Sequence, residues 1–128
     1  MQLTENFNLS EFASNDGAEF TLEAKLNLRV LSKQIQIIRD HFGRAININS
    51  GYRSKEHNKA IGGAANSYHV KGMAADMRIE GVSPKALHGQ IQMLIDAGKI
   101  MQGGLGLYDS FVHYDIRGHL ARWNFSTK

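Results

Sequence analysis

The sequence predicts a single α+β domain in which a small, largely antiparallel sheet packs against two main helices. Apolar residues recur every three to four positions over residues 21–42, as in an amphipathic helix, and alternate with polar residues over 45–50, as in a half-buried strand. Helical and strand patterns do not alternate regularly, which disfavours a doubly wound fold. The 128 residues contain one proline and no linker-like segment, so we assign residues 1–128 to one domain.

Two helices are predicted in the first third of the chain. Residues 8–12 indicate one helical turn, with Ser10 as its cap. Residues 21–42 predict a long helix that Thr21 caps and Gly43 ends. Its apolar positions are expected to face the core, and they are Leu22, Leu26, Val30, Leu31, Ile35, Ile38 and Phe42.

The rest of the chain predicts shorter elements around glycine-rich loops. A strand at 45–50 leads to Arg53, and Ser54 can cap a short helix that stops before Gly62. A shaped loop follows at 64–68, a strand at 74–79, and a helix from 83 to 98 that begins at Ser83-Pro84. Two adjacent strands are predicted near 103–108 and 111–116, and an edge strand at 122–124.

Composition excludes several classes of partner and site. The net charge is +3, but lysine and arginine are scattered and no nucleic-acid-binding motif is present, so we expect no nucleic-acid partner. A basic nucleic-acid binder would instead show steeply salt-dependent binding. No segment approaches the roughly 20 apolar residues of a membrane span, so we expect no membrane partner either. The chain has no cysteine, so any metal must be held by His, Asp or Glu.

His69, Asp76 and His113 are the candidate metal ligands. His69 and Asp76 flank a run rich in small residues and glycine, and His113 lies in an apolar segment where an unpartnered imidazole would be costly to bury. Two imidazoles and one carboxylate around an open fourth position form a ligand set that catalytic zinc favours. A histidine and an aspartate at this spacing also occur by chance, as ordinary hydrogen-bonded residues.

Three linked motifs make the interpretation more specific. They are SGYRS at residues 50–54, a glycine-rich segment running into SYHVKGMAAD at 62–76, and GLGLY followed by FVHYDIRG at 104–118. In this order they resemble the zinc peptidases of the M15 family, the D-Ala-D-Ala carboxypeptidases and L-Ala-D-Glu endopeptidases of bacterial cell-wall peptides, with the hedgehog signalling domain as a distant relative. The resemblance covers nearly the whole chain.

The resemblance implies a zinc site on the sheet with one Zn²⁺ ion. It matches His69, Asp76 and His113 to the three zinc ligands, and Arg53 to the arginine that binds substrate near the scissile bond. The residue chemistry agrees with a hydrolytic role. Three protein ligands leave one position for water, and zinc lowers the pKa of that water to about 7, which makes it a nucleophile at neutral pH. A permanently charged guanidinium can hold a carboxylate or offset the charge that develops on the attacked carbonyl. Without the motif, Arg53 would equally suit a surface ion pair.

The sequence departs from the wider family at the general base. Many members carry Glu or Asp three residues before the last zinc histidine, where this chain has Ser110. In an extended strand, Asp109, His113 and Asp115 would point to one side, so Asp109 or Asp115 could serve as the base. We favour Asp115, whose His-x-Asp arrangement resembles a short subgroup of the family. The alternative role for Asp115 is to orient a ligand or an arginine.

Ser67, Tyr108 and Trp123 are expected, with Arg53, to line the substrate groove. All three lie in or near the recognised motifs, although aromatic residues at strand ends are more often part of the core. The expected substrate is a peptidoglycan stem peptide, cut by an enzyme of the carboxypeptidase or endopeptidase type that acts as a monomer. The alternative is a non-catalytic, zinc-containing module that binds the cell wall or belongs to a phage particle.

The first residues lack the basic and apolar regions of a signal peptide. We therefore expect synthesis in the cytoplasm, followed by action on the cell wall after release. This would suit an endolysin of a phage or prophage, or an enzyme exported by an unidentified route.

Overall fold

The computed structural model describes residues 1–127 and contains five strands, three α-helices and two short 3₁₀ helices. No helix in this part of the chain is long and apolar enough to cross a membrane. In chain order the elements are η1 (Leu9–Phe12), α1 (Leu22–Phe42), β1 (Asn47–Ser50), α2 (Lys55–Ala60), η2 (Tyr68–Lys71), β2 (Ala74–Arg78), α3 (Pro84–Asp96), β3 (Gly104–Leu107), β4 (Val112–Asp115) and β5 (Ala121–Asn124).

The strands form one sheet in the order β1-β2-β4-β3-β5. Every neighbouring pair is antiparallel except β3 and β5, which run parallel. The prediction of a small, largely antiparallel α+β fold is confirmed, and so is the placement of residues 122–124 at an edge. The connection from β3 to β4 is short, whereas β2 and β3 are connected through α3.

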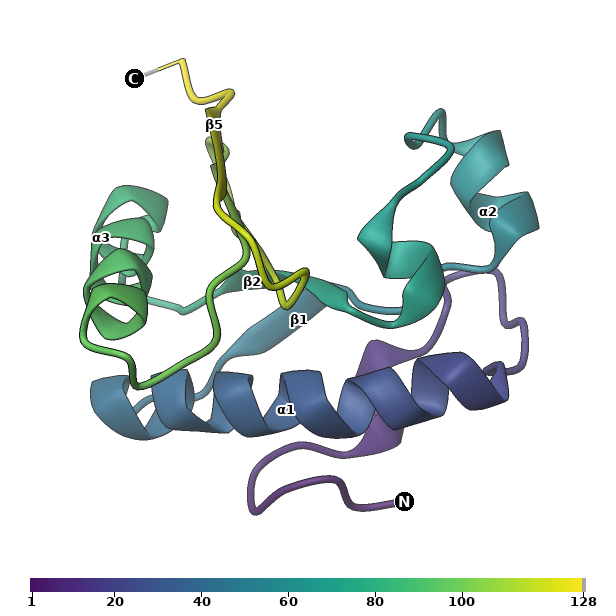
Figure 1. Cartoon of the computed structure of the whole chain (residues 1–128), viewed down its shortest axis with the longest axis horizontal. Coiled ribbons are helices and arrows are strands. Elements are labelled where there is room, and N and C mark those ends of the chain that lie inside the picture. Colours follow the sequence, from purple (N-terminus) through teal and green to yellow (C-terminus); the bar gives the residue numbers. More distant parts are fainter. Residues whose placement is uncertain (128) are drawn as a thin grey trace.

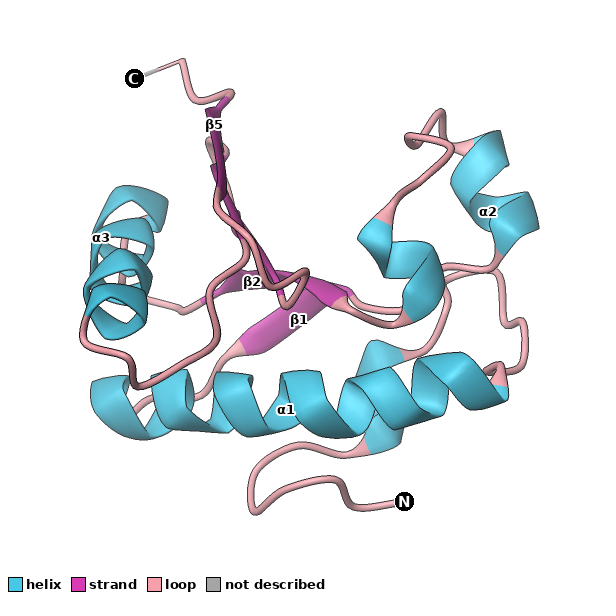
Figure 2. Ribbon diagram, in the orientation of Figure 1, coloured by secondary structure: helices cyan, strands magenta, loops and turns pink. Residues whose placement is uncertain are grey.

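The helices occupy different sides of this sheet. α1 runs along the base of the molecule beneath β1 and β2 (Figure 1). α3 packs against β3 and β4 on one side, while α2 and η2 stand on the other side of the strands (Figure 2). The sheet thus has one face toward the main helices and another toward the segment that carries α2 and η2.

Residue alternation gives the two faces different chemistry, since successive side chains of a strand point to opposite faces. The face toward the helices carries buried apolar side chains from β2, β3 and β4, among them Met77, Leu105 and Tyr114. The opposite face carries Asp76 and His113, with glycines at the matching positions of β3. The candidate site therefore lies on a face whose other side is the hydrophobic core.

The predicted apolar stripe of α1 is correct in its C-terminal half, where Leu31, Ile35 and Ile38 are buried, and wrong in its N-terminal half. Leu22 and Leu26 are 72% and 56% exposed, and Val30 is also exposed, whereas Leu28 is fully buried. The buried residues of α1 are Ala24, Leu28, Leu31, Ser32, Ile35 and Ile38. Ala24 is buried because the backbone of η2 approaches closely, so that a Cβ at Gly72 would collide with it. Small residues that permit this approach were missed by a search for apolar periodicity.

The starts of α1, α2 and α3 agree with the sequence, whereas the start of η1 and the end of α3 do not. Thr21, Ser54 and Ser83 each accept a hydrogen bond from the backbone of the first turn of α1, α2 and α3. The cap of η1 is Asn8 and not Ser10, because Asn8 and Glu11 form a reciprocal capping box that begins the turn two residues earlier. α3 ends at Asp96, before the predicted end at Gly98.

Candidate metal centre

A row of cross-strand neighbours organises the site. Asp76 of β2 lies opposite His113 of β4, and His113 lies opposite Gly106 of β3. The row continues at both ends, with Ser50 of β1 beside Asp76 and Trp123 of β5 beside Gly106. Because paired residues share a face of the sheet, the register brings two candidate ligands together although 37 positions separate them in the chain.

His69 reaches the same point from η2. The Ser67 hydroxyl accepts a hydrogen bond from the His69 backbone N–H at 3.2 Å and caps this short helix. The His69 ring is buried, and its Nδ1 lies 2.7 Å from the Gly51 carbonyl oxygen. This contact turns Nε2 toward Asp76, whose Oδ1 lies 3.3 Å away. A backbone carbonyl thus fixes which nitrogen of His69 faces the site.

Both ring nitrogens of His113 contact carboxylates, and one of these is again the carboxylate of Asp76. Its Nδ1 lies 3.0 Å from Asp76 Oδ1, and its Nε2 lies 2.8 Å from Asp115 Oδ2. One ligand atom from each of His69, Asp76 and His113 falls within 4.8 Å of the others. All three side chains are buried, so η2 and the sheet hold them in place before any ligand binds.

The two carboxylates and His113 shift one another's pKa. Burial raises the pKa of Asp76, but hydrogen bonds and charge interactions with His113 and His69 outweigh it and hold that pKa well below its usual range. Burial lowers the pKa of His113, but Asp115 and Asp76 raise it above its ordinary value. The metal-free site therefore favours an imidazolium between two carboxylates, and a cation that binds there displaces the proton.

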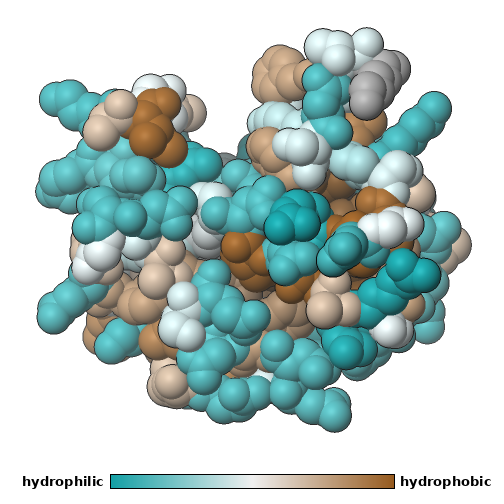
Figure 3. Space-filling model, turned by 180° about the vertical axis from the view of Figure 1, so that it is seen from behind, coloured by the Kyte–Doolittle hydropathy of each residue, from teal (hydrophilic) through white to brown (hydrophobic). Residues whose placement is uncertain are grey.

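These three residues line a cleft with a volume of about 780 Å³. One wall comes from the segment that carries α2 and η2, and the other from β4, β5 and the loop before β4. Seen from behind, the molecule is visibly hollowed between these two parts (Figure 3). The cleft lining includes all of the predicted ligands and all of the predicted substrate-binding residues, namely His69, Asp76, His113, Arg53, Ser67, Tyr108 and Trp123.

Comparison with known proteins identifies the family. The model of the family described as Peptidase M15 matches residues 4–115. The chain belongs to the M15 peptidase family. It is also similar to a Haemophilus influenzae protein named probable peptidoglycan L,D-endopeptidase MepK, with 36% identity over 85 residues. That match covers 61% of this chain and 42% of the relative, so the chain spans less than half of that protein's length.

The donor set of this M15 chain suits a divalent metal. Each imidazole has one nitrogen held by an oxygen acceptor, Gly51 for His69 and Asp115 for His113, which leaves the other nitrogen for a cation. Metal-binding histidines usually show this second contact, because it fixes the tautomer and makes the ligand more basic. Nitrogen and carboxylate donors without thiolate are compatible with zinc.

Arg53 stands beside the ligands on the α2 side of the cleft. Its Nη2 lies 3.5 Å from Asp76 Oδ2, while its Nε and Nη1 contact Ser50 and Asn58 at 3.3 and 3.2 Å. The Arg53 backbone N–H donates to the His69 carbonyl at 3.0 Å. The segment after β1 therefore places a guanidinium next to the candidate metal ligands, and the substrate-binding role that the M15 resemblance implied stays a prediction.

The two carboxylates expected as general base occupy different places. Asp115 is fully buried beneath His113, and both of its oxygens are engaged by His113, Arg117 and the Gly104 N–H. Neither Asp115 nor Asp109 lines the cleft. The contacts of Asp115 match the alternative role considered for it, which is to orient a ligand and an arginine, and the base role stays a prediction.

Asp109 does not share a face with His113. β4 begins at Val112, so the extended strand on which that prediction depended does not reach Asp109. Its two carboxylate oxygens accept hydrogen bonds from the backbone N–H and the hydroxyl of Thr127, both at 2.8 Å. The predicted alignment of Asp109 with His113 and Asp115 is therefore wrong.

Two glycines of β3 make room for the site, and sequence reasoning assigned them no role. A Cβ at Gly106 would collide with the indole of Trp123, which packs 5.0 Å from the His113 ring. A Cβ at Gly104 would collide with the carboxylate of Asp115. The period-two spacing of these glycines was visible in the sequence. The need for glycine depends on the side chains that fill the space beside them, which are Trp123 and Asp115.

The N-terminal arm supports the site from behind. The Asp16 carboxylate accepts hydrogen bonds from Ser54 at 2.6 Å and from Ser14 at 2.7 Å. The hydrogen bonds from Ser54, Ser14 and the Ala18 backbone lower the pKa of Asp16 to about 2. Because Ser54 follows Arg53 directly and caps α2, this network holds the segment that carries the arginine.

Proposed function

We propose that this M15 protein is a zinc-dependent peptidase that hydrolyses amide bonds in peptidoglycan stem peptides. The observation that carries the proposal is the cluster of His69, Asp76 and His113 at the floor of an open cleft. Family membership and the printed name of the Haemophilus influenzae relative support the substrate class.

In this proposal His69, Asp76 and His113 hold one zinc ion. Bound zinc would supply a Lewis acid and a nucleophilic water at neutral pH. Arg53 lies beside Asp76, where its guanidinium can bind a substrate carboxylate or stabilise negative charge that develops on the scissile carbonyl. Gly51 and Asp115 keep the two imidazoles oriented.

The walls of the cleft would align the peptide. Tyr108 stacks on Phe111 with ring centroids 4.3 Å apart, and its hydroxyl accepts a hydrogen bond from Trp123 Nε1 at 2.9 Å. These contacts fix an aromatic surface along one wall. Ser67 lies on the other wall, where its hydroxyl already caps η2. A stem peptide lying between the two walls would pass over the metal ligands.

The decisive experiment digests defined stem peptides with the zinc-loaded protein and identifies the products by mass. Loss of a terminal D-alanine would identify a carboxypeptidase, and an internal cut would identify an endopeptidase. We expect hydrolysis to disappear with a chelator, to return with zinc, and to be lost in His113→Ala. Activity that survived in His113→Ala, or a purified protein without stoichiometric zinc, would refute the proposal.

One observation favours the second candidate, a non-catalytic module that binds the cell wall or forms part of a phage particle. Among the residues described here, Asp76 is the only carboxylate that lines the cleft, and it is a proposed metal ligand. A module of this kind would bind stem peptides and zinc but yield no products. The mass experiment, run beside a binding titration, separates it from the enzyme.

The setting in which the protein acts belongs to the same proposal. A lysis enzyme of a phage or prophage would reach the cell wall after release through a membrane pore. We expect co-expression with a holin to lyse cells when the protein is wild type. Co-expression with His113→Ala should not, and equal lysis by both would argue against this role.

A further inference from the structure

We propose that Arg117 forms a second carboxylate-binding subsite in the cleft, which makes the protein select stem peptides that carry a free carboxylate at that position. This inference rests on the proposed function and names a feature of its substrate. It concerns a residue that lies in the recognised motif but had been given no role.

The guanidinium of Arg117 has one nitrogen left to use. Its Nε donates to Asp115 Oδ1 at 2.9 Å, and its Nη2 donates to Asp115 Oδ2 at 2.8 Å. Nη1 has no hydrogen-bond partner in residues 1–127, although Arg117 lines the cleft. Since a guanidinium cannot lose its charge, this nitrogen keeps donors available on a residue that lines the cleft.

Aromatic rings from both walls hold Arg117 in place. The centre of its guanidinium lies 4.4 Å from the Tyr68 ring of η2 and 5.5 Å from the Trp123 ring of β5. Together with the two hydrogen bonds to Asp115, these contacts fix both the position and the plane of the group. A donor that is already ordered loses little entropy when it binds a ligand.

The charges around the cleft favour an anionic ligand. Asp115 neutralises only part of Arg117, because its oxygens also accept from His113 and the Gly104 N–H. Asp76 faces the proposed metal, whose charge exceeds its own. Arg53 adds a second guanidinium to the lining. A peptide carboxylate would therefore enter a site of net positive charge in partly desolvated surroundings.

The two arginines are tied to different metal ligands. Arg53 contacts Asp76 directly, whereas Arg117 reaches His113 only through Asp115. Two cations attached to different ligands can bind separate groups of one extended peptide. Arg53 is expected near the scissile bond, so we assign to Arg117 a carboxylate elsewhere along the stem peptide, held by a charge-assisted hydrogen bond.

The test measures binding to the zinc-loaded protein by stopped flow, so that occupancy is recorded before any peptide is cut. Trp123 is the single tryptophan of the chain and borders the cleft, so its fluorescence reports occupancy. The ligands are stem peptides in which one carboxylate at a time is converted to a carboxamide. We expect one of these changes to weaken binding by about tenfold or more, the usual effect of losing a charged hydrogen bond.

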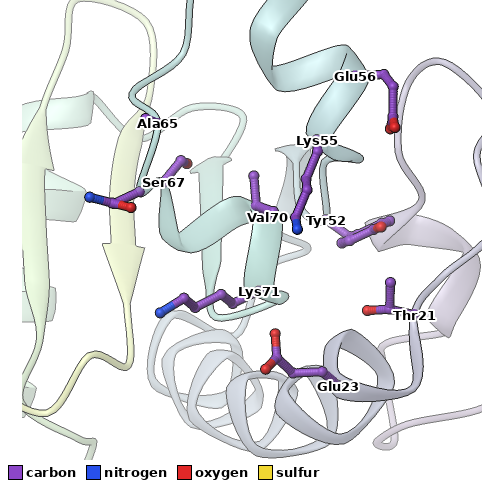
Figure 4. A pocket seen from close by; sticks show the side chains of 10 residues that line it. Thr21, Glu23, Tyr52, Lys55, Glu56, Ala65, Ser67, Val70 and Lys71 are labelled. Carbon is purple, nitrogen blue, oxygen red and sulfur yellow. The ribbon is translucent and has the colours of Figure 1, made fainter.

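Substitution of Arg117 assigns that loss to its guanidinium. In Arg117→Gln the acid and the amide should bind equally, and in Arg117→Lys part of the preference should remain because the charge is kept. Lys71→Gln is the matched control. Lys71 also lies against the Tyr68 ring, with its Nζ 5.5 Å from the ring centroid, but it belongs to a neighbouring pocket of about 720 Å³ and does not line the cleft (Figure 4). The preference should be unchanged in Lys71→Gln.

Each of three results would refute the proposed subsite. The first is equal binding of acid and amide peptides by the wild type. The others are a preference for the acid peptide that persists in Arg117→Gln, or one that is lost only in Arg53→Gln. Hydrolysis by the zinc-loaded protein is measured separately on the same peptides. Cleavage of all of them with equal kcat/KM would refute the subsite alone, whereas binding preference without any cleavage would refute the enzyme and leave the subsite supported.

Discussion

His113 Nε2 lies 2.8 Å from Asp115 Oδ2, so a candidate metal ligand and the acidic residue two positions further along the same strand are directly joined. Asp115 is in turn held by Arg117 and by the Gly104 N–H. The carboxylate therefore sets the direction in which His113 points, and it does so from a position that the cleft does not reach.

Asp115→Asn should weaken zinc binding by about 10- to 100-fold, the usual cost of losing a partner behind a metal ligand. The amide is close in shape, but it cannot accept hydrogen bonds at both ends. Competition with a chromogenic chelator measures the affinity, and circular dichroism checks the fold. If Asp115 were instead only a general base, zinc affinity would stay at the wild-type value while hydrolysis fell.

Gly104→Ala should disturb the same group from the neighbouring strand. Its new methyl group would collide with the Asp115 carboxylate and Arg117, at a cost of about 1–3 kcal/mol in the free energy of unfolding. The matched control is Gly89→Ala in α3, where a Cβ meets nothing within 4 Å and should stabilise the helix by about 1 kcal/mol. Urea denaturation of both variants tests this, and equal stabilities would contradict the predicted contact.

Asp16→Asn should reduce stability at neutral pH and lose its effect in acid. The pKa of Asp16 falls from 3.8 to about 2 on folding, because the carboxylate accepts hydrogen bonds from Ser54, Ser14 and Ala18. A lowered pKa stabilises the folded state fully above pH 3.8, and this contribution disappears as the pH falls through about 2. Urea denaturation of both proteins at several pH values should therefore show their difference shrinking in acid. A constant difference would exclude the charge as its source.

Leu28→Ala and Leu26→Ala compare the two faces of α1 with the same chemical change. Leu28 is fully buried, so its truncation should lower the free energy of unfolding by about 2–5 kcal/mol. Leu26 is 56% exposed, so its truncation should change stability by about 0.5 kcal/mol or less. The sequence-based stripe predicts the reverse ranking, and thermal or urea unfolding decides between them.

The clustering of the candidate metal ligands could be predicted because their motifs are local and the M15 resemblance orders them. The absence of cysteine restricts any metal to histidine and acidic ligands, but it does not by itself choose among the six histidines of the chain. The M15 resemblance ordered these residues and added Arg53. The strands were also foreseeable, because each shows a short alternating or apolar run between turn residues.

The supporting residues could not be predicted because their roles depend on register and on close backbone contact. Gly104 and Gly106 matter only because Asp115 and Trp123 occupy the space beside them. Asp109 lies too early in the chain to join β4, and no periodic pattern marks that boundary. Arg117 follows Asp115 at the spacing of one strand face, a signal that could have suggested their pairing.

The row from β1 to β5 also has a consequence for how the protein matures. Asp76 and His113 belong to this row, so these two candidate ligands meet only after β2 and β4 have paired in register. A slip of one residue in β4 would replace His113 with Val112 or Tyr114 and bury the imidazole in the core. Tight metal capture should thus be among the last events of folding, and nascent or misregistered chains would escape premature loading.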